Sequence, residues 1–288
     1  MTTRSLARII PGLNTSDGAG VKLRRTLGQS QMARLDPFLM LDEFSSDNAD
    51  DYIAGFPSHP HRGFETVTYM LDGHMLHEDH MGNRGDLRPG DVQWMTCGRG
   101  IIHSEMPQQK EGRMRGFQLW LNLPAKDKMK PAAYRDVPAA SMPWHEPLPG
   151  VRIKVIAGDL DLAGQRYSGP IQVGATEPVY VDIELSADQS LSLPVPSSHN
   201  AFIYVFEGTL QSDGKDVRTH AAALLGSGDT LEVTAGVEGG RFLLIAGRPL
   251  NEPVAQYGPF VMNTAAEIDQ ALRDYRDGTL TSGGVRSL

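Results

Sequence analysis

The sequence is poor in the features that mark secreted, membrane and nucleic-acid-binding proteins. A disulfide framework is impossible because Cys97 is its single cysteine. Residues 1–12 lack the apolar stretch of a signal peptide, and no apolar run approaches the ~18 residues of a membrane span. The 27 basic residues are outnumbered by 35 acidic ones and form no block, which argues against direct nucleic-acid binding. We therefore expect a cytoplasmic protein with no membrane contact.

The remaining composition is typical of a globular protein with two domains or a repeated fold. Hydrophobic residues make up 40% of the 288, and the 31 glycines and 19 prolines are too few for a low-complexity chain. At ~150 residues per domain, the length corresponds to about two units. From residue 64 onward, short apolar stretches alternate with turn residues, as in FETVTYML before Asp72-Gly73. This spacing predicts an all-β sandwich or barrel.

The second half of the chain resembles the first. Tyr69–Gly73 matches Tyr204–Gly208 at an offset of 135 residues, and Gly90-Asp91 matches Gly228-Asp229 at an offset of 138. A repeat of this length indicates a duplicated domain. Between the two halves, residues 131–150 contain five prolines and no regular period, which is typical of a linker.

The C-terminal region has a different pattern. Residues 265–278 are predicted to form one amphipathic helix, because apolar residues recur at positions 268, 271, 272 and 275. The last ten residues, 279–288, are expected to be a loose tail.

Two short motifs carry side chains that can bind a metal. His59-Pro-His61 precedes one predicted strand, and His103-Ser-Glu105 follows another. In an extended chain residues i and i+2 lie on the same face, so each motif directs two donors the same way. Three imidazoles and one carboxylate suit Fe, Mn, Co, Ni, Cu or Zn, and they include no thiolate of the kind that marks structural zinc. A six-coordinate metal with four such ligands keeps two positions for water, O2 or a chelating substrate.

The duplicated half serves as a control for this interpretation. A single His-x-His is weak evidence in a chain with nine histidines. At the equivalent positions, the second half has Pro194 and Pro196 for the first motif and Arg241 and Leu243 for the second. A metal site is therefore expected in the first half alone.

Longer segments closely resemble the pirin family of the cupin superfamily. They are FPSHPHRGFETVTYMLDG (56–73), NRGDLRPGDVQWMTCGRGIIHSEMP (83–107), LPAKDKMKPAAY (123–134), HNAFIYVFEG (199–208) and PLNEPVAQYGPFVMNTAAEI (249–268). The resemblance implies an all-β bicupin, with two tandem β-barrel (double-stranded β-helix) domains and a C-terminal helix that packs back on the protein. The corresponding boundaries are 1–130 for the N-terminal metal-binding cupin domain, 131–150 for the Pro-rich linker, 151–262 for the C-terminal metal-free cupin domain, and 263–288 for the helix and tail.

Carried over to this sequence, the pirin metal ligands are His59, His61, His103 and Glu105. They imply one divalent transition metal, with iron expected ahead of Mn, Co, Ni, Cu or Zn. General cupins usually take their carboxylate from the first motif, where this chain has Glu65. We assign Glu105 as the ligand and Glu65 as a group that orients a ligand histidine; the alternative for Glu65 is an ordinary paired barrel carboxylate.

Other residues near the motifs are candidates for the surroundings of the metal. Arg62 either steers an anionic substrate or pairs with Glu65. A solvated hairpin, rather than a second metal site, is expected for the three histidines after the Asp72-Gly73 turn: His74, His77 and His80. An apolar pocket lining, or alternatively plain core, is expected of Phe56, Trp94, Met95 and Met106.

Three kinds of function are compatible with these residues. The resemblance implies quercetin 2,3-dioxygenase activity in some pirins, in which Glu105 would be the catalytic base that prepares a flavonol-like aromatic for O2. An alternative is a non-catalytic, metal- or redox-dependent regulator that binds a transcription factor or a metabolic enzyme. A third is another cupin reaction on a small acid, which would require several basic residues around the metal. Only Arg62 and Arg99 adjoin the motifs, so an apolar pocket and the dioxygenase are favoured.

Overall fold

The computed structural model describes residues 2–30, 33–172 and 174–282 and divides the chain into two compact units. One unit, here called the histidine-bearing unit, consists of Asn14–Arg25, Phe38–Ala139 and Leu250–Leu288. The other, here called the second unit, consists of Met1–Leu13, Thr26–Pro37 and Ala140–Pro249. Of the predicted tail, residues 283–288 lie outside the described residues.

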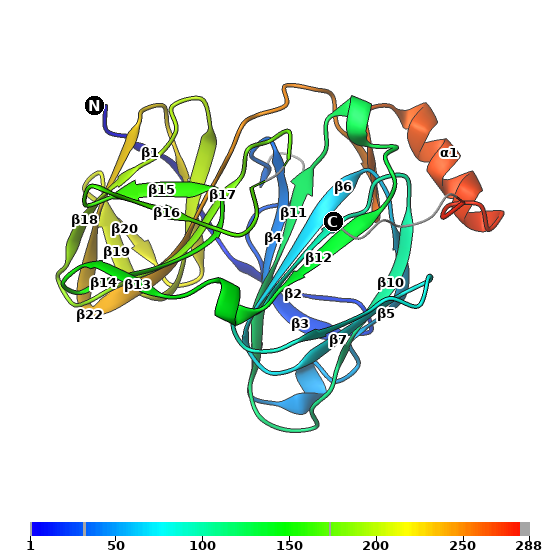
Figure 1. The fold of residues 1–288 in the computed structure, drawn as a ribbon, viewed down its shortest axis with the longest axis horizontal. Coiled ribbons are helices and arrows are strands. Elements are labelled where there is room, and N and C mark those ends of the chain that lie inside the picture. The colour runs from blue at the N-terminus through cyan, green and yellow to red at the C-terminus, as the bar shows by residue number, and fades with distance from the viewer. Residues whose placement is uncertain (1, 31–32, 173, 283–288) are drawn as a thin grey trace. The chain divides into compact units, whose positions relative to one another are not determined.

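Antiparallel strand pairing builds the histidine-bearing unit (Figure 1). Its larger sheet has the order β12 (Ala133–Val137), β9 (Val92–Thr96), β6 (Phe64–Asp72), β11 (Met114–Asn122), β4 (Phe38–Ser46), β3 (Val21–Arg25) and β2 (Leu13–Asp17). Its smaller sheet has the order β5 (Phe56–His61), β10 (Ile101–Pro107), β7 (Met75–Asp79) and β8 (Arg84–Leu87). The remaining elements are the pair β23 (Ala255–Tyr257) and β24 (Phe260–Met262), the helix α1 (Ala265–Arg276), and the short helices η2 (Ala49–Asp51) and η3 (Ala125–Asp127).

The second unit is built around one nine-stranded sheet. Its main path runs β1 (Leu6–Pro11), β21 (Ala221–Leu225), β19 (Asn200–Ser212), β22 (Thr230–Gly247), β17 (Val179–Leu185), β14 (Val151–Ala157) and β13 (His145–Leu148). Off this path, β18 (Ser190–Pro194) pairs with β22 and β20 (Lys215–Arg218) pairs with β19. A separate pair comprises β15 (Asp159–Leu162) and β16 (Gln165–Ser168), and η4 (Ala139–Ser141) precedes β13.

The two units repeat one strand order, as the sequence repeat predicts. The order β9-β6-β11-β4 in one unit corresponds to β21-β19-β22-β17 in the other. The strands β6 and β19, which carry the matched Tyr69–Gly73 and Tyr204–Gly208 segments, occupy equivalent places. The all-β prediction with one C-terminal helix is confirmed.

The units differ from the expected boundaries because strands far apart in the chain pair with each other. β1 pairs with β21, so the N-terminal residues complete the sheet of the second half. β12, which lies within the expected 131–150 linker, pairs with β9 of the first half. The C-terminal residues from Leu250 onward belong to the histidine-bearing unit rather than to the second unit.

Helix α1 begins where the sequence predicts and ends at Arg276, two residues before the expected position 278. The hydroxyl of Thr264 accepts a hydrogen bond from the backbone N–H of Glu267, whose carboxylate accepts one from the N–H of Thr264 in return. Ile268 and Ala271 form its buried face and pack with Phe260 of β24. Helix α1 therefore packs against β24. In turn, β24 contacts the chain beside the first histidine motif.

The interiors of the two units have different chemistry. The core of the second unit is aliphatic and aromatic, with Ile153, Val181, Val205 and Phe242 at 4% exposure or less. Arg241, which the sequence offset of 138 residues matches to His103, lies in β22, the counterpart of β11 rather than of β10, and pairs with Asp182 at 2.7 Å. Among the described residues, the group of side chains that could hold a metal ion lies in the histidine-bearing unit.

Candidate metal centre

Strand pairing brings the two histidine motifs together. In β10, burial alternates: Ile101, His103 and Glu105 face inward, while the residues between them are partly exposed. His103 lies directly opposite His59 of the neighbouring β5, and Ile101 lies opposite His61. Directly opposed residues on one face of a sheet have Cβ atoms about 5 Å apart, which is close enough for their rings to share a ligand.

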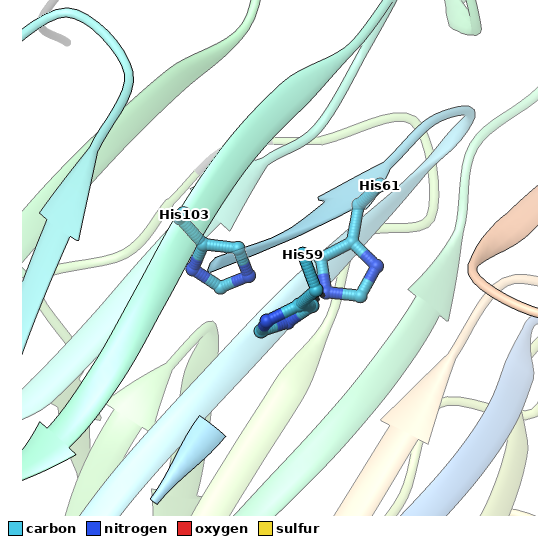
Figure 2. Close-up of side chains that lie close together, drawn as sticks. All are labelled: His59, His61 and His103. Atoms are coloured by element: carbon cyan, nitrogen blue, oxygen red, sulfur yellow. Dashed lines mark hydrogen bonds between the residues drawn. The ribbon is translucent and has the colours of Figure 1, made fainter. Parts of the chain in front are cut away.

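The three imidazoles converge on one small space (Figure 2). The Nε2 atoms of His59 and His61 are 3.0 Å apart. The ring centroid of His103 lies 4.4 Å from that of His59 and 5.0 Å from that of His61. One nitrogen from each ring lies within 4.8 Å of the others. Two adjacent ligands of a metal at about 2.1 Å are separated by about 3.0 Å, so the His59–His61 spacing fits a shared ion.

The outer hydrogen bonds of the rings leave nitrogen lone pairs directed inward. His59 Nδ1 lies 2.8 Å from the carbonyl oxygen of Pro57, so it carries the proton and leaves Nε2 as a lone pair. The buried Nε2 of His103 has no partner among the described residues. Converging lone pairs repel one another unless a proton or a cation lies between them, and this arrangement therefore fits a metal ion.

Burial keeps the rings of His61 and His103 in the neutral form that binds a metal. The pKa of His61 and that of His103 are lowered well below the ordinary 6.5, chiefly by desolvation and further by the neighbouring histidines. A metal binds neutral imidazole, so these two rings have no proton to lose at neutral pH.

Glu105 is beside this cluster rather than within it. Its carboxylate is 5% exposed and lies on the same face of β10 as His103, but it is outside the group whose donor atoms lie within 4.8 Å. The hydroxyl of Thr68 lies 3.1 Å from Glu105 Oε1 and 2.5 Å from the amide oxygen of Gln118. Burial raises the pKa of Glu105, whereas His59 and the Thr68 hydrogen bond oppose the rise.

Aromatic rings that the sequence did not single out form one wall of the site. The ring of His61 lies 5.1 Å from that of Phe64 and 5.3 Å from that of Trp120. Met95, an expected pocket residue, belongs to the same apolar cluster. Trp120 is only partly buried, so this wall continues to the protein surface.

Two expected pocket residues lie on faces turned away from the histidines. Trp94 lies opposite Val67 of β6, whereas Met95 lies opposite Thr66; alternation therefore places Trp94 on the other face of the sheet. In β10, Met106 alternates with Glu105 in the same way. Phe56 is partly buried against a separate apolar cluster.

Glu65 has partners other than histidine. Its carboxylate accepts hydrogen bonds from Trp94 Nε1 at 3.2 Å and Thr96 Oγ1 at 2.6 Å, and Lys130 Nζ lies 3.9 Å away. These contacts match the alternative of a paired barrel carboxylate rather than a group that orients a ligand histidine.

One of the three hairpin histidines is buried. His74 is partly exposed beside Asp86, and His80 is exposed, as expected. The prediction is wrong for His77, which is 0% exposed because it lies on the inward face of β7, opposite Glu105.

Arg62 is 3% exposed and binds the C-terminal segment instead of Glu65. Its guanidinium contacts Asp274 of α1 at 2.7 Å and the carbonyl of Arg99. The backbone of Arg62 also pairs with Pro259 and Val261. Because Arg62 follows His61 and Arg99 precedes His103, α1 and β24 support both histidine motifs.

We expect Asp274→Asn to lower the free energy of unfolding of the apoprotein by about 1–3 kcal/mol, because it leaves the buried Arg62 charge without its carboxylate. Urea unfolding measures the change. Asp269→Asn, an exposed carboxylate on the same helix, is the control. Equal stabilities of the two variants would contradict a supporting role for the pair.

The strand order and the site together define a bicupin in which one barrel carries a cluster of three imidazoles. Family models agree: "Pirin" matches residues 20–121, and "Pirin C-terminal cupin domain" matches residues 180–281. The chain belongs to the pirin family.

Similar proteins cover nearly the whole chain. A Pseudomonas aeruginosa protein named "Putative quercetin 2,3-dioxygenase" is 52% identical over 96% of this chain and 98% of its own length. Human pirin is 41% identical, with 91% and 89% covered. A crystal structure of quercetin 2,3-dioxygenase from Acinetobacter baumannii matches with a TM-score of 0.88 and 33% identity, over 96% of this chain and 98% of that one. Among the described residues, no helix has the length and apolarity needed to cross a membrane.

Proposed function

We propose that this protein is a metal-dependent dioxygenase that cleaves a flavonol-like aromatic with O2, in the manner of quercetin 2,3-dioxygenase. The observation that carries the proposal is the cluster of His59, His61 and His103, whose donor nitrogens lie within 4.8 Å of one another. The names of the bacterial relatives support the same activity. The three histidines and Glu105 would hold one divalent metal, which we propose to be iron.

The surroundings suit an aromatic substrate better than a small acid. Phe64 and Trp120 stand beside His61, and Met95 packs with them. Arg62, the basic residue next to the first motif, is bound by Asp274. An aromatic ring system would therefore meet apolar walls, and the other cupin reactions on small acids are disfavoured.

In the proposed reaction, Glu105 would accept the proton of a substrate hydroxyl. When bound, the metal would supply a Lewis acid that stabilises the resulting oxyanion and a position for O2. The carboxylate of Glu105 would take the proton, because its raised pKa makes it a stronger base than an exposed carboxylate. Thr68 would keep this carboxylate in place through its hydroxyl. His61 and His103, whose pKa values are lowered by burial, would be neutral and keep their ring nitrogens available.

We expect Glu105→Gln to lower the turnover of quercetin by about 100-fold or more, because a positioned general base contributes about that much. Metal content should fall far less, since the three imidazoles remain. Steady-state rates and metal analysis of the same preparation test this, with exposed Glu78→Gln on the neighbouring strand as the control. Parallel loss of metal and rate would remove the base assignment and leave Glu105 as a ligand only.

A further inference from the structure

A fourth histidine lies beside the cluster and is not one of its members. His77 Nδ1 lies 3.3 Å from His103 Nδ1, and the two ring centroids are 4.8 Å apart. The pairing of β7 with β10 produces this contact: His77 is directly opposite Glu105 and diagonal to His103. Diagonal neighbours on one face of a sheet are within reach of long or aromatic side chains.

The contact with His103 is the hydrogen-bonding contact of the buried His77 side chain in the described residues. His77 is 0% exposed, and its Nε2 has no partner among the described residues. The ring centroid of Tyr134 is 5.9 Å from that of His77. Burying a polar ring costs free energy unless it is hydrogen-bonded, so the bond to His103 compensates for part of that cost.

Which ring donates in the His77–His103 hydrogen bond determines the tautomer of His103. The Nε2 of His103 is the nitrogen without a protein partner. A neutral imidazole with a lone pair at Nε2 carries its proton at Nδ1, and this proton needs an acceptor. His77 Nδ1 is within hydrogen-bond distance and supplies the acceptor if its own proton is at Nε2. The two rings therefore fix each other's tautomers.

We propose that His77 is a positioning residue for the metal ligand His103: it accepts the Nδ1–H of His103 and so holds the ring with its Nε2 lone pair toward the metal. The inference rests on the metal site of the proposed function, but not on the dioxygenase reaction. Metal-bound histidines generally donate their second N–H to such a partner, and loss of the partner costs about 10–100-fold in metal affinity.

A matched pair of variants tests the acceptor separately from the volume of the side chain. Asparagine and leucine are similar in size, but only asparagine offers an oxygen near the place of His77 Nδ1. We expect His77→Leu to weaken Co(II) binding to the apoprotein by about 10–100-fold, and His77→Asn to stay within about threefold of the wild type. His74→Leu, on the same hairpin but partly exposed, should leave the affinity unchanged.

Nitrogen NMR of the apoprotein gives a second readout. The imidazole shifts of His103 should show the proton at Nδ1 in the wild type and in His77→Asn, and a mixture of tautomers in His77→Leu. Equal Co(II) affinities of the two His77 variants, or a proton at Nε2 of His103 in the wild type, would overturn the proposal. Absence of Co(II) binding in the wild type would overturn both this proposal and the metal site, whereas binding without quercetin oxidation would overturn the dioxygenase alone.

Discussion

Replacement of His103 by alanine is expected to lower the affinity of the apoprotein for a divalent metal by more than about 100-fold. The reason is geometric: His103 is the single donor that β10 adds to the imidazole cluster, and its Nε2 has no partner among the described residues. Loss of a direct ligand should cost at least as much as the loss of a residue that orients one, which is about 10–100-fold.

Metal titration of the apoprotein, followed by analysis of bound metal after dialysis, measures this loss. The control is His80→Ala, which removes an exposed histidine from the same unit. If His103→Ala keeps the wild-type affinity while remaining folded, the three-histidine cluster is not the metal centre.

The second large effect is a loss of stability of the apoprotein as the pH falls. His61, His77 and His103 are buried and have lowered pKa values, about 4 for His77 and well below 6.5 for the other two. The unfolded chain binds protons at these residues below pH 6.5, whereas the native state does not. Their contribution to stability is therefore complete above pH 6.5 and is lost as the pH falls toward 4 and below.

Buried carboxylates offset part of this loss. The pKa values of Glu65 and Glu105 are raised above 4.5 by burial, so the native state takes up protons there while the unfolded chain is still ionised. We expect a net dependence of about one to two protons, or about 1.4–3 kcal/mol per pH unit, between pH 6 and 4.5. Urea unfolding of the metal-free protein at several pH values gives this slope.

One substitution isolates the contribution of a single histidine. His77→Leu should reduce the slope by up to about one proton, because the unfolded chain then has one histidine fewer to protonate. His80→Leu, at an exposed position, should leave the slope unchanged. Identical slopes for His77→Leu and the wild type would show that His77 is not neutral in the folded protein.

The sequence could place the candidate donors of each motif on one face because that geometry is local. In His59-Pro-His61 and His103-Ser-Glu105, alternation along a strand decides which side chains share a face, and this needs no knowledge of the fold. What the sequence could not supply was the register that sets His103 opposite His59, because pairing between distant strands leaves no local signal. Nor could it show that the register shifts after His103, so that Glu105 pairs with Phe56 and lies beside the cluster.

The residues around the donors were harder to predict for the same reason. His77 follows a turn, and turn residues suggest solvent, yet its strand lies against β10 and is covered on that face. The sequence holds one hint: His77 lies two residues after the apolar Met75 and so shares its face in a strand. For Trp94 and Met106 the sequence left open a pocket lining or plain core, and because neighbours in a strand face opposite sides, both face away from the histidines.

The boundaries of the two units show most clearly what could not be predicted from the sequence. The expected linker 131–150 contains the change of unit between Ala139 and Ala140, but Ala133–Val137 within it form an edge strand, where proline on either side is tolerated. The terminal segments carry no feature in their own sequence that assigns β1 to the second half or β24 to the first. Long-range pairing makes those assignments.

The most direct test of the account is oxygen uptake on addition of quercetin to protein loaded anaerobically with Fe(II), and separately with Mn, Co, Ni and Cu. The account predicts uptake that depends on the metal, is largest with iron, and disappears in His103→Ala. No uptake with any metal, in wild-type protein shown by analysis to be loaded, would contradict the proposed dioxygenase.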